Sequence, residues 1–515
     1  MKKIILSCLL IFVVLITGCA SQKSVSMQVP EPDYWPTAGW QSSTPEAQGM
    51  DSNLLAKMLE EINTNETSIH SVLVIRNGYL VTEAYFQPYT RDTKIHIQSV
   101  TKSVIGMLAG KAISDGYIKN EDSKLVDFYQ NRIFENPSRK KNSIQLKHLL
   151  SMSSGLDCQE FSSGPSMEQT SGWVQFMLDR PMTAAPGKVF GYCNGNAHLL
   201  SSILEKSTGM SAREYANQEL FQPLGIIDVN EADWRGDPQQ ITIGGYGLHL
   251  KPIDMTKLAF LYLHNGQWED QQILPPLWVA DSTTQHIQKE DGSGYGYLWT
   301  VYPEDGHYAA LGLGGQQIHI YPSKNLLVIV TASLESFAEA PEIEKMLHEY
   351  ILPTIQSDRL LAENSKGYAR LQAALETAAN PVRLVASLPA TALDISGSTY
   401  AFGENPLGWE ELELVFERGA KIAQLHLNDY RAREIGLDNI YRLSTGEPLG
   451  ELLLRGRWAD DQTFLIDYPY PANGNPILGE LGETQFLFKF TGDNLNVTIE
   501  QLVFGGEPIV FEGTR

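Results

Sequence analysis

Residues 98–106 read QSVTKSVIG and continue as an apolar run to Ile113. Apolar residues follow one another with little interruption, so the pattern predicts a helix that begins near Ser99. On such a helix Lys102 lies one turn after Ser99 and on the same face. The rest of this segment is apolar and expected to be buried, so the charged side chain of Lys102 needs an explanation.

The Ser99–Lys102 spacing suits nucleophilic catalysis. A lysine held against apolar side chains loses hydration, which favours the neutral amine that can take a proton from a serine. The serine then becomes a usable nucleophile, and a helix N-terminus offers backbone N–H groups to an oxyanion. Chance alone also supplies this spacing. A second copy, Ser138 to Lys141, lies in a basic polar run outside any apolar helix.

A serine–lysine pair often works with a tyrosine that relays protons, and three Tyr-x-Asn triplets occur, at Tyr129, Tyr192 and Tyr215. The first follows a predicted helix and the third lies inside one. Tyr192 and Asn194 instead follow a Pro-Gly turn and precede an amphipathic helix, so they lie on a loop where side chains can converge. The alternative is that Tyr192 is only a half-buried loop aromatic.

Residues 309–322 read AALGLGGQQIHIYP, and their glycines lead into a predicted strand. Glycine at Gly312 lets another backbone or a ligand approach closely. The edge of this strand can supply a second N–H group to an oxyanion. A tight bend at a sheet edge is the structural alternative.

Taken together and in this order, the three segments resemble the active-site motifs of the serine β-lactamase and penicillin-binding-protein superfamily. The similarity is greatest to class C β-lactamase-like hydrolases, a group that includes esterases, D-amino-acid peptidases and 6-aminohexanoate-dimer hydrolases. It extends over about residues 40–355, where LKHLLSMSSGLD, FQPLGI and YGYLW also fit the family. The resemblance implies an α/β (α+β) fold with an antiparallel five-stranded sheet flanked by helices. A helical subdomain lies beside the sheet, with the site between them.

The resemblance also implies a role for each matching residue. Ser99 is the acylated nucleophile, Lys102 its general base, and Tyr192 the relay that protonates the leaving group and activates water. Asn194 orients the substrate and the lysine. The backbone N–H groups of Ser99 and Leu313 form the oxyanion hole.

The third motif departs from the family. Where β-lactamases have Lys-Thr-Gly, this chain has Ala310, Leu311 and Gly312. The lysine that meets a β-lactam or peptide carboxylate is absent, while Gly312 keeps its place beside the substrate. An ester or amide substrate is therefore favoured over a β-lactam. His307, close by in sequence, is interpreted as a surface histidine at a strand end.

Composition excludes several classes of function. The chain has 515 residues and a net charge of −22, so binding to nucleic acid is disfavoured. The 11 histidines are scattered, and neither a His-Glu-x-x-His nor a Cys-x-x-Cys motif occurs, which argues against a catalytic metal. We expect no cofactor and a small ester, amide or peptide substrate.

The N-terminus resembles a bacterial lipoprotein signal. Two lysines precede a short apolar run that ends in Ile-Thr-Gly-Cys19, the pattern of a lipobox. We expect Cys19 to carry lipid and to anchor an exported protein facing the periplasm or the cell surface. The alternative is an ordinary signal peptide that happens to contain a cysteine.

Two cysteines remain in the mature chain, Cys158 and Cys193. Exported proteins form disulfides readily, so we expect these two to pair. Two free buried thiols are the alternative.

Turn signals and strand-like patterns in the rest of the sequence divide the chain into segments. A β-hairpin is expected around Asn77-Gly78, a strong turn signal, and short alternating strands near the C-terminus indicate an antiparallel barrel or sandwich. The expected segments are a signal (1–19), a tether (20–40), a hydrolase-like domain (41–358), a linker (359–385) and a β domain (386–515). A lipoprotein that binds or senses a ligand without turnover is the functional alternative to an enzyme.

Overall fold

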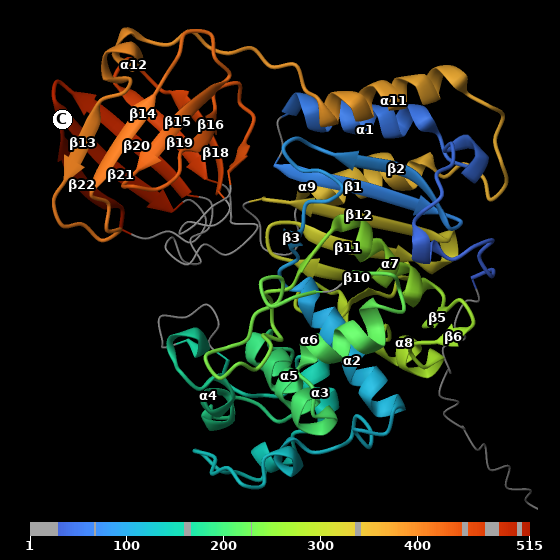
Figure 1. Ribbon diagram of the computed structural model, residues 1–515. Coiled ribbons are helices and arrows are strands. Elements are labelled where there is room, and N and C mark those ends of the chain that lie inside the picture. The colour runs from blue at the N-terminus through green and yellow to red at the C-terminus, as the bar shows by residue number, and fades with distance from the viewer. Residues whose placement is uncertain are drawn as a thin grey trace, which may run out of the picture.

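The computed structural model describes residues 29–65, 68–158, 166–227, 229–334, 341–444, 452–468, 484–501 and 507–515. The chain forms an α/β body followed by a C-terminal β-barrel, which lies beside it (Figure 1). The expected signal peptide, Cys19 and most of the tether fall outside the described residues.

An antiparallel sheet of eight strands organises the α/β body. Both ends of this body contribute, since β1 and β2 pair with strands from residues 307–332. In spatial order the strands are β2 (Tyr79–Tyr85), β1 (Ile69–Arg76), β12 (Leu326–Ala332), β11 (Gln316–Tyr321), β10 (His307–Gly312), β9 (Thr300–Tyr302), β8 (Gly294–Tyr295) and β7 (Ile287–Gln288).

The predicted hairpin is present between β1 and β2. Asn77 and Gly78 have φ values of 52° and 82°, which a type I′ turn requires. The implied sheet is wider than five strands because β7, β8 and β9 continue it past β10. Each of these strands has only two or three residues.

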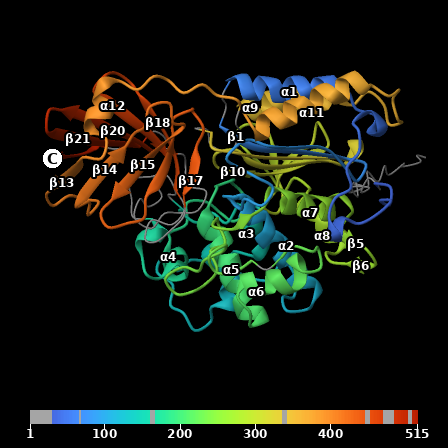
Figure 2. The same cartoon turned by 45° about the horizontal axis from the view of Figure 1, so that its top comes forward.

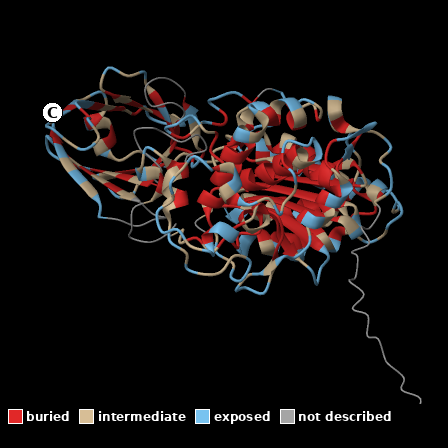
Figure 3. Cartoon of the chain, turned by 90° about the horizontal axis from the view of Figure 1, so that it is seen from below, coloured by how far each residue is buried: buried red, intermediate tan, exposed pale blue. Residues whose placement is uncertain are grey.

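Both faces of the sheet are covered. Along β1, Val72 and Val74 belong to one core cluster and Leu73 and Ile75 to the other, as the two-residue period of a strand requires. Buried residues accordingly concentrate in the sheet and the helices against it (Figure 3). One face carries α1 (Ser52–Asn65), α9 (Pro341–Lys345), η8 (Met346–Ile351), α10 (Leu352–Thr354) and α11 (Ser365–Ala379), with α1 and α11 side by side (Figure 2).

The opposite face carries the helical lobe. The helix α2 (Val100–Ser114) is buried along nearly its whole length, which explains its uniformly apolar sequence. Around it lie α3 (Leu146–Leu150), α4 (Trp173–Asp179), α5 (Asn194–Thr208), α6 (Ala212–Ala216), α7 (Pro252–Leu263) and α8 (Pro276–Ser282).

The expected linker differs from the structure. Residues 359–385 contain α11, which packs on α1 and places Leu371, Ala374 and Ala378 in the core of the sheet's outer face. This helix is amphipathic, and its polar face made it look like a spacer in the sequence. The α/β body therefore continues to the end of α11.

The C-terminal body is a barrel and not a sandwich. Among its described residues, ten strands form one sheet, and all but β17 close into a ring through the pairing of β16 with β18. Phe464, Phe486, Phe488 and Phe490 fill the interior together with aliphatic residues. The strands are β13 (Thr399–Phe402), β14 (Glu411–Val415), β15 (Ile422–Leu427), β16 (Arg433–Gly436), β17 (Arg442–Ser444), β18 (Leu452–Trp458), β19 (Thr463–Tyr468), β20 (Thr484–Thr491), β21 (Asn494–Gln501) and β22 (Ile509–Thr514).

Within the residues that the structure describes, we find no helix with both the length and the apolarity needed to cross a membrane.

Candidate active site

Ser99 lies at the junction between β3 (Ile95–His96) and α2, as the N-cap residue of the helix. Its side chain is half-buried, so a substrate can reach it. The preceding residue, Gln98, has a φ of 50°, which is uncommon for a residue with a side chain. The chain thus turns sharply to present Ser99 at the helix N-terminus.

Two neighbours hold this turn. The segment pairs with β4 (His249–Leu250), and the N–H of Ile97 donates to the carbonyl of Leu248 at 2.9 Å. On another side lies Gly312, where a Cβ atom would stand 2.8 Å from the carbonyl oxygen of Ile97. Glycine is therefore needed at this end of β10 because two backbones meet there.

Lys102 is the most enclosed member of the site, with 1% of its surface exposed. Its Nζ donates to Ser99 Oγ at 2.9 Å, to Asn194 Oδ1 at 2.6 Å and to the carbonyl of Gly245 at 2.6 Å. These are all three hydrogen bonds that an ammonium can make. Asn194 Oδ1 and the Gly245 carbonyl only accept, so they retain the amine's two N–H groups if one proton leaves. The lone pair then points at Ser99.

Tyr192 lies on the loop that enters α5, as expected, whereas Asn194 is the first residue of that helix. The Nζ of Lys102 lies 4.6 Å from the centre of the Tyr192 ring, close enough for a cation–π interaction. Burial, with a smaller contribution from Tyr192, raises the pKa of neighbouring Tyr295 well above its usual value. The Tyr295 hydroxyl therefore stays protonated and uncharged. The structure thus brings Ser99, Lys102, Tyr192 and Asn194 together.

The other two Tyr-x-Asn triplets lie elsewhere. Tyr215 donates its hydroxyl to Asp115 at 2.7 Å, and Tyr129 is buried in the helical lobe. Neither ring contacts the Ser99–Lys102 pair through any interaction recorded among the described residues. The position of Tyr192 on a loop before a helix was the sequence feature that distinguished it from Tyr129 and Tyr215.

The second serine–lysine spacing has a structural role. Lys141 is as buried as Lys102, although its sequence context suggested a polar surface run. Its Nζ donates to the carbonyls of Glu135 and Leu178, at 2.7 and 2.8 Å, and so ties a loop to the end of α4.

Gly245 is the participant that sequence reasoning missed. A Cβ at this position would lie 2.9 Å from Asn194 Cβ and 3.0 Å from Asn194 Oδ1, so only glycine lets its carbonyl and Asn194 meet the same amine. The sequence signal for this position is the glycine-rich stretch GGYGLHL, residues 244–250. The N–H of Gly247 also donates to His96 Nε2 at 2.9 Å, and burial keeps the pKa of His96 well below its usual value. A neutral His96 can accept this bond.

The third motif occupies the end of β10. Ala310 is buried, Leu311 is half-buried, and Leu313 lies in the turn that leads to β11. Gly314 and Gly315 have φ values of 75° and 91°, which explains the glycine pair in this turn. The contact of Gly312 with the segment before Ser99 brings this turn to the site.

Cys158 and Cys193 form a disulfide. Cys193 is fully buried and stands between Tyr192 and Asn194, so the bond ties the tyrosine loop to a neighbouring segment. That segment is itself held, because Leu156 forms a β-bridge with Met182.

His307 was expected on the surface, and this expectation is wrong. Its ring is 5% exposed and stacks between Tyr302 and Tyr321, at centroid distances of 4.2 and 4.4 Å. Burial lowers its pKa to about 4. The surrounding strand ends are aromatic, and this is why a strand-end histidine becomes covered. The described residues hold no cluster of three or more histidine, cysteine or acidic side chains suited to a metal.

Comparison with known proteins gives a consistent assignment for this body. Residues 57–349 match the family model described as Beta-lactamase. A 6-aminohexanoate-dimer hydrolase from Paenarthrobacter ureafaciens is 21% identical over 322 residues, covering 56% of this chain and 80% of the relative. An uncharacterised protein from Alkalihalophilus pseudofirmus is 24% identical over 308 residues, covering 50% of this chain and 82% of its own.

A solved structure supports the fold. A Bacillus anthracis protein described as a candidate 6-aminohexanoate-dimer hydrolase superimposes with a TM-score of 0.51 at 19% identity. The superposition covers 65% of this chain and 92% of that protein. The C-terminal barrel lies beyond the range that the family model matches.

Proposed function

Because the chain belongs to the Beta-lactamase family and is a serine hydrolase, we propose that it opens an ester or amide bond through an acyl-enzyme on Ser99. The observation that carries this proposal is the set of contacts around Lys102. Two obligate acceptors fix its amine, and the third direction is occupied by Ser99 Oγ at 2.9 Å. A neutral amine in this place is a base aimed at the nucleophile.

The first half of the reaction follows from this arrangement. Ser99 Oγ attacks the substrate carbonyl carbon while its proton passes to Lys102 Nζ. The bond to the leaving group then breaks, and the leaving oxygen or nitrogen takes up that proton. Tyr192, over which Lys102 Nζ lies, is the relay that carries it. An acyl group remains on Ser99.

Water completes the cycle by the reverse route. Its proton passes to the Lys102–Tyr192 pair, its oxygen attacks the acyl carbon, and Ser99 leaves with a proton restored. The negative charge that develops on the carbonyl oxygen in both halves is assigned to the backbone N–H groups of Ser99 and Leu313. The contact between Gly312 and the Ser99 segment supports this assignment.

We infer that the substrate is neutral where it meets the third motif. Leu311, half-buried beside Gly312, stands in the motif that carries a lysine in β-lactamases. An apolar side chain there does not pair with a carboxylate, which favours ester or simple amide substrates over β-lactams. The name of the Paenarthrobacter ureafaciens relative, 6-aminohexanoate-dimer hydrolase, supports amides among the substrates.

A panel of aryl esters, peptide amides and penicillins tests the proposal on wild-type protein and Ser99→Ala. Wild type is expected to turn over esters or amides faster than penicillins, and Ser99→Ala to lose this activity with little change in melting temperature. Labelling of Ser99 without turnover of any compound would favour the sensing alternative. Activity retained in Ser99→Ala would refute the catalytic role.

We also propose that the protein is a lipoprotein, anchored to a membrane through Cys19. The lipobox-like sequence supports this, and the segment lies outside the described residues. Cells fed an alkyne fatty acid are expected to label the wild type and not Cys19→Ser. Equal labelling of both proteins would contradict the anchor.

A further inference from the structure

The barrel touches the α/β body through a small apolar cluster. Tyr89, Ile95 and Leu453 are 8%, 2% and 7% exposed, and Tyr441 packs against them. Tyr89 lies between β2 and β3, and Ile95 is the first residue of β3. Leu453 lies on β18, and Tyr441 directly precedes β17. This contact joins the barrel to the segment that continues to Ser99.

Leu453 is buried against Tyr89 and Ile95 of the α/β body. Its neighbours on β18, Leu452 and Leu454, point into the barrel core, so Leu453 points outward. The register partner of Leu453 on β17 is Leu443, which shares this outer face and is 41% exposed. The two leucines thus share one outer face of the barrel. Leu443 is exposed there, and Leu453 is buried where it packs against Tyr89 and Ile95.

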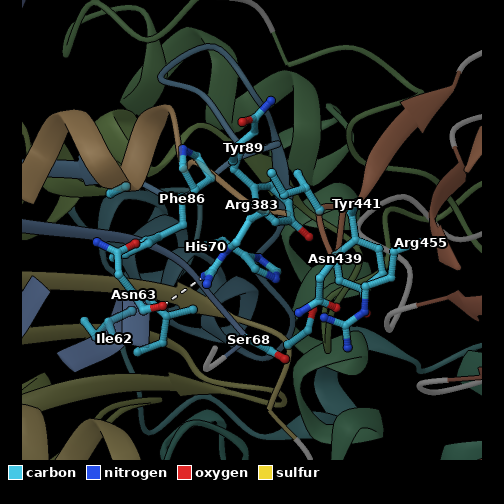
Figure 4. A pocket seen from close by; sticks show the side chains of 16 residues that line it. Ile62, Asn63, Ser68, His70, Phe86, Tyr89, Arg383, Asn439, Tyr441 and Arg455 are labelled. Carbon is cyan, nitrogen blue, oxygen red and sulfur yellow. Dashed lines mark hydrogen bonds between the residues drawn. The ribbon is translucent and has the colours of Figure 1, made fainter. Parts of the chain in front are cut away.

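A cavity of about 90 Å³ borders the cluster and is lined from both bodies (Figure 4). On one side His70 stacks on Tyr89, with ring centres 3.8 Å apart. On the other, the guanidinium of Arg455 lies 4.6 Å from the centre of the Tyr441 ring. The apolar cluster beside this cavity is a direct contact between the two bodies.

The path from this contact to the nucleophile is short and rigid. Ile95 begins β3 and is four positions before Ser99. The intervening residues pair with β4, and Gln98 is held in a left-handed conformation. A shift of Ile95 is therefore passed along the backbone toward Ser99, because the pairing with β4 and the close approach of Gly312 leave the intervening residues little room to adjust.

We propose that the barrel is a positioning element for the nucleophile. Leu453 and Tyr441 hold the segment from Tyr89 to Ile95, and this keeps Ser99 Oγ in line with the amine of Lys102. The inference rests on the proposed function of Ser99. It gives the barrel a role in catalysis without contact with the substrate.

The test measures the rate at which a fluorophosphonate probe phosphonylates Ser99 in the full chain, as a function of probe concentration. In this step Ser99 Oγ forms a bond to phosphorus and fluoride leaves. Leu453→Ala is expected to lower the maximal rate about tenfold with little change in half-saturating concentration, since small misplacements of reacting atoms are costly. Leu443→Ala, the matched control on the same face, is expected to react like wild type.

A double-mutant cycle separates this role from general destabilisation. Ile95→Ala is expected to slow labelling similarly, and the double variant with Leu453→Ala to be no slower than either single variant, because both remove one contact. Leu453→Met is expected to restore the rate. If Leu453→Ala does not fold, Leu453→Val shortens the same contact and replaces it.

The outcomes distinguish the two proposals. Equal maximal rates in wild type and Leu453→Ala would overturn the positioning role of the barrel and leave the acyl-enzyme proposal intact. Slower labelling with additive effects of the two single variants would also overturn it. Absence of any labelling at Ser99 in wild type would overturn the proposed function itself.

Discussion

Two lysines with the same spacing from a serine show what decides chemistry at the scale of a residue. Lys102 and Lys141 are equally buried, so burial does not distinguish them. The amine of Lys141 donates to two carbonyls and so holds a loop in place. The amine of Lys102 is held by two acceptors in a way that leaves its third direction to Ser99.

This contrast predicts the effect of removing each amine. Lys102→Met is expected to slow acylation of Ser99 by about 10³-fold, because general base catalysis is lost. Lys141→Met is the matched control, expected to lower the melting temperature and to leave the rate per folded molecule unchanged. Single-turnover kinetics with an aryl ester measure both. Comparable loss of rate in the two variants would contradict the assigned base.

A second prediction at this scale concerns His307. Its unfolded pKa is near 6.5 and its folded pKa is about 4, so the native state binds fewer protons between these values. The free energy of unfolding should therefore fall as pH drops from 6.5 to 4, by up to about 3 kcal/mol from this residue. His319 and His70, with pKa values of about 3, add to the same trend.

His307→Phe keeps the aromatic stack and removes the titrating group. Chemical denaturation at pH 7 and pH 4.5 is expected to show a smaller loss of stability in this variant than in wild type. An equal loss in both proteins would mean that His307 is not buried as a neutral ring.

At the scale of the element, the sequence was sufficient where local pattern decides structure. The start of α2 at Ser99, the loop before α5 and the hairpin at Asn77 were all predictable from periodicity and turn residues. Gly245 was not, because its role depends on a close approach to Asn194, about 50 positions away in the chain. The burial of His307 depends in the same way on rings from other strands.

Gly245 predicts a sharp difference between two glycines. In Gly245→Ala the new methyl group meets Asn194 at 2.9 Å and displaces it from Lys102, so acylation should slow by about tenfold or more. Gly191→Ala is the matched control, since its Cβ would meet nothing within 4 Å. Single-turnover acylation rates of the two variants test this prediction. A wild-type rate in Gly245→Ala would contradict the claim that only glycine lets the Gly245 carbonyl and Asn194 meet the Lys102 amine.

The disulfide between Cys158 and Cys193 gives a second prediction at the scale of the element. Removing it with Cys193→Ser should lower the free energy of unfolding by about 3–4 kcal/mol, given a sequence separation of 35 residues. It should also slow acylation, because Cys193 lies between Tyr192 and Asn194. Cys158→Ser is expected to match both effects, and the double variant to add nothing. An unchanged acylation rate in all three variants would mean that the disulfide contributes to stability and not to catalysis.

At the scale of the whole molecule, the α/β body and the barrel have separate cores, and a small apolar cluster lies between them. The number of strands in the sheet and the packing of α11 could not be predicted, because both depend on contacts between distant segments. The β character of the C-terminal body could be predicted from alternation alone. Closure into a barrel required the pairing of β16 with β18.

Separate cores predict separate unfolding. Phe488→Ala, in the barrel interior, should destabilise the barrel by about 3–5 kcal/mol and leave the unfolding transition of the α/β body nearly unchanged. If the barrel positions Ser99, the rate of acylation should already fall over the barrel transition, before the α/β body unfolds. Hydrogen exchange and labelling with denaturant measure the two together. Full activity after barrel unfolding would contradict the coupling.

The acyl-enzyme on Ser99 is the central claim, and rapid mixing with a slowly hydrolysed aryl ester followed by intact-protein mass measurement tests it most directly. Wild type is predicted to gain the mass of the acyl group transiently, with the adduct mapped to Ser99, while Ser99→Ala and Lys102→Met show none. Hydrolysis of the ester by Ser99→Ala at the wild-type rate, or an adduct on another residue, would contradict the account.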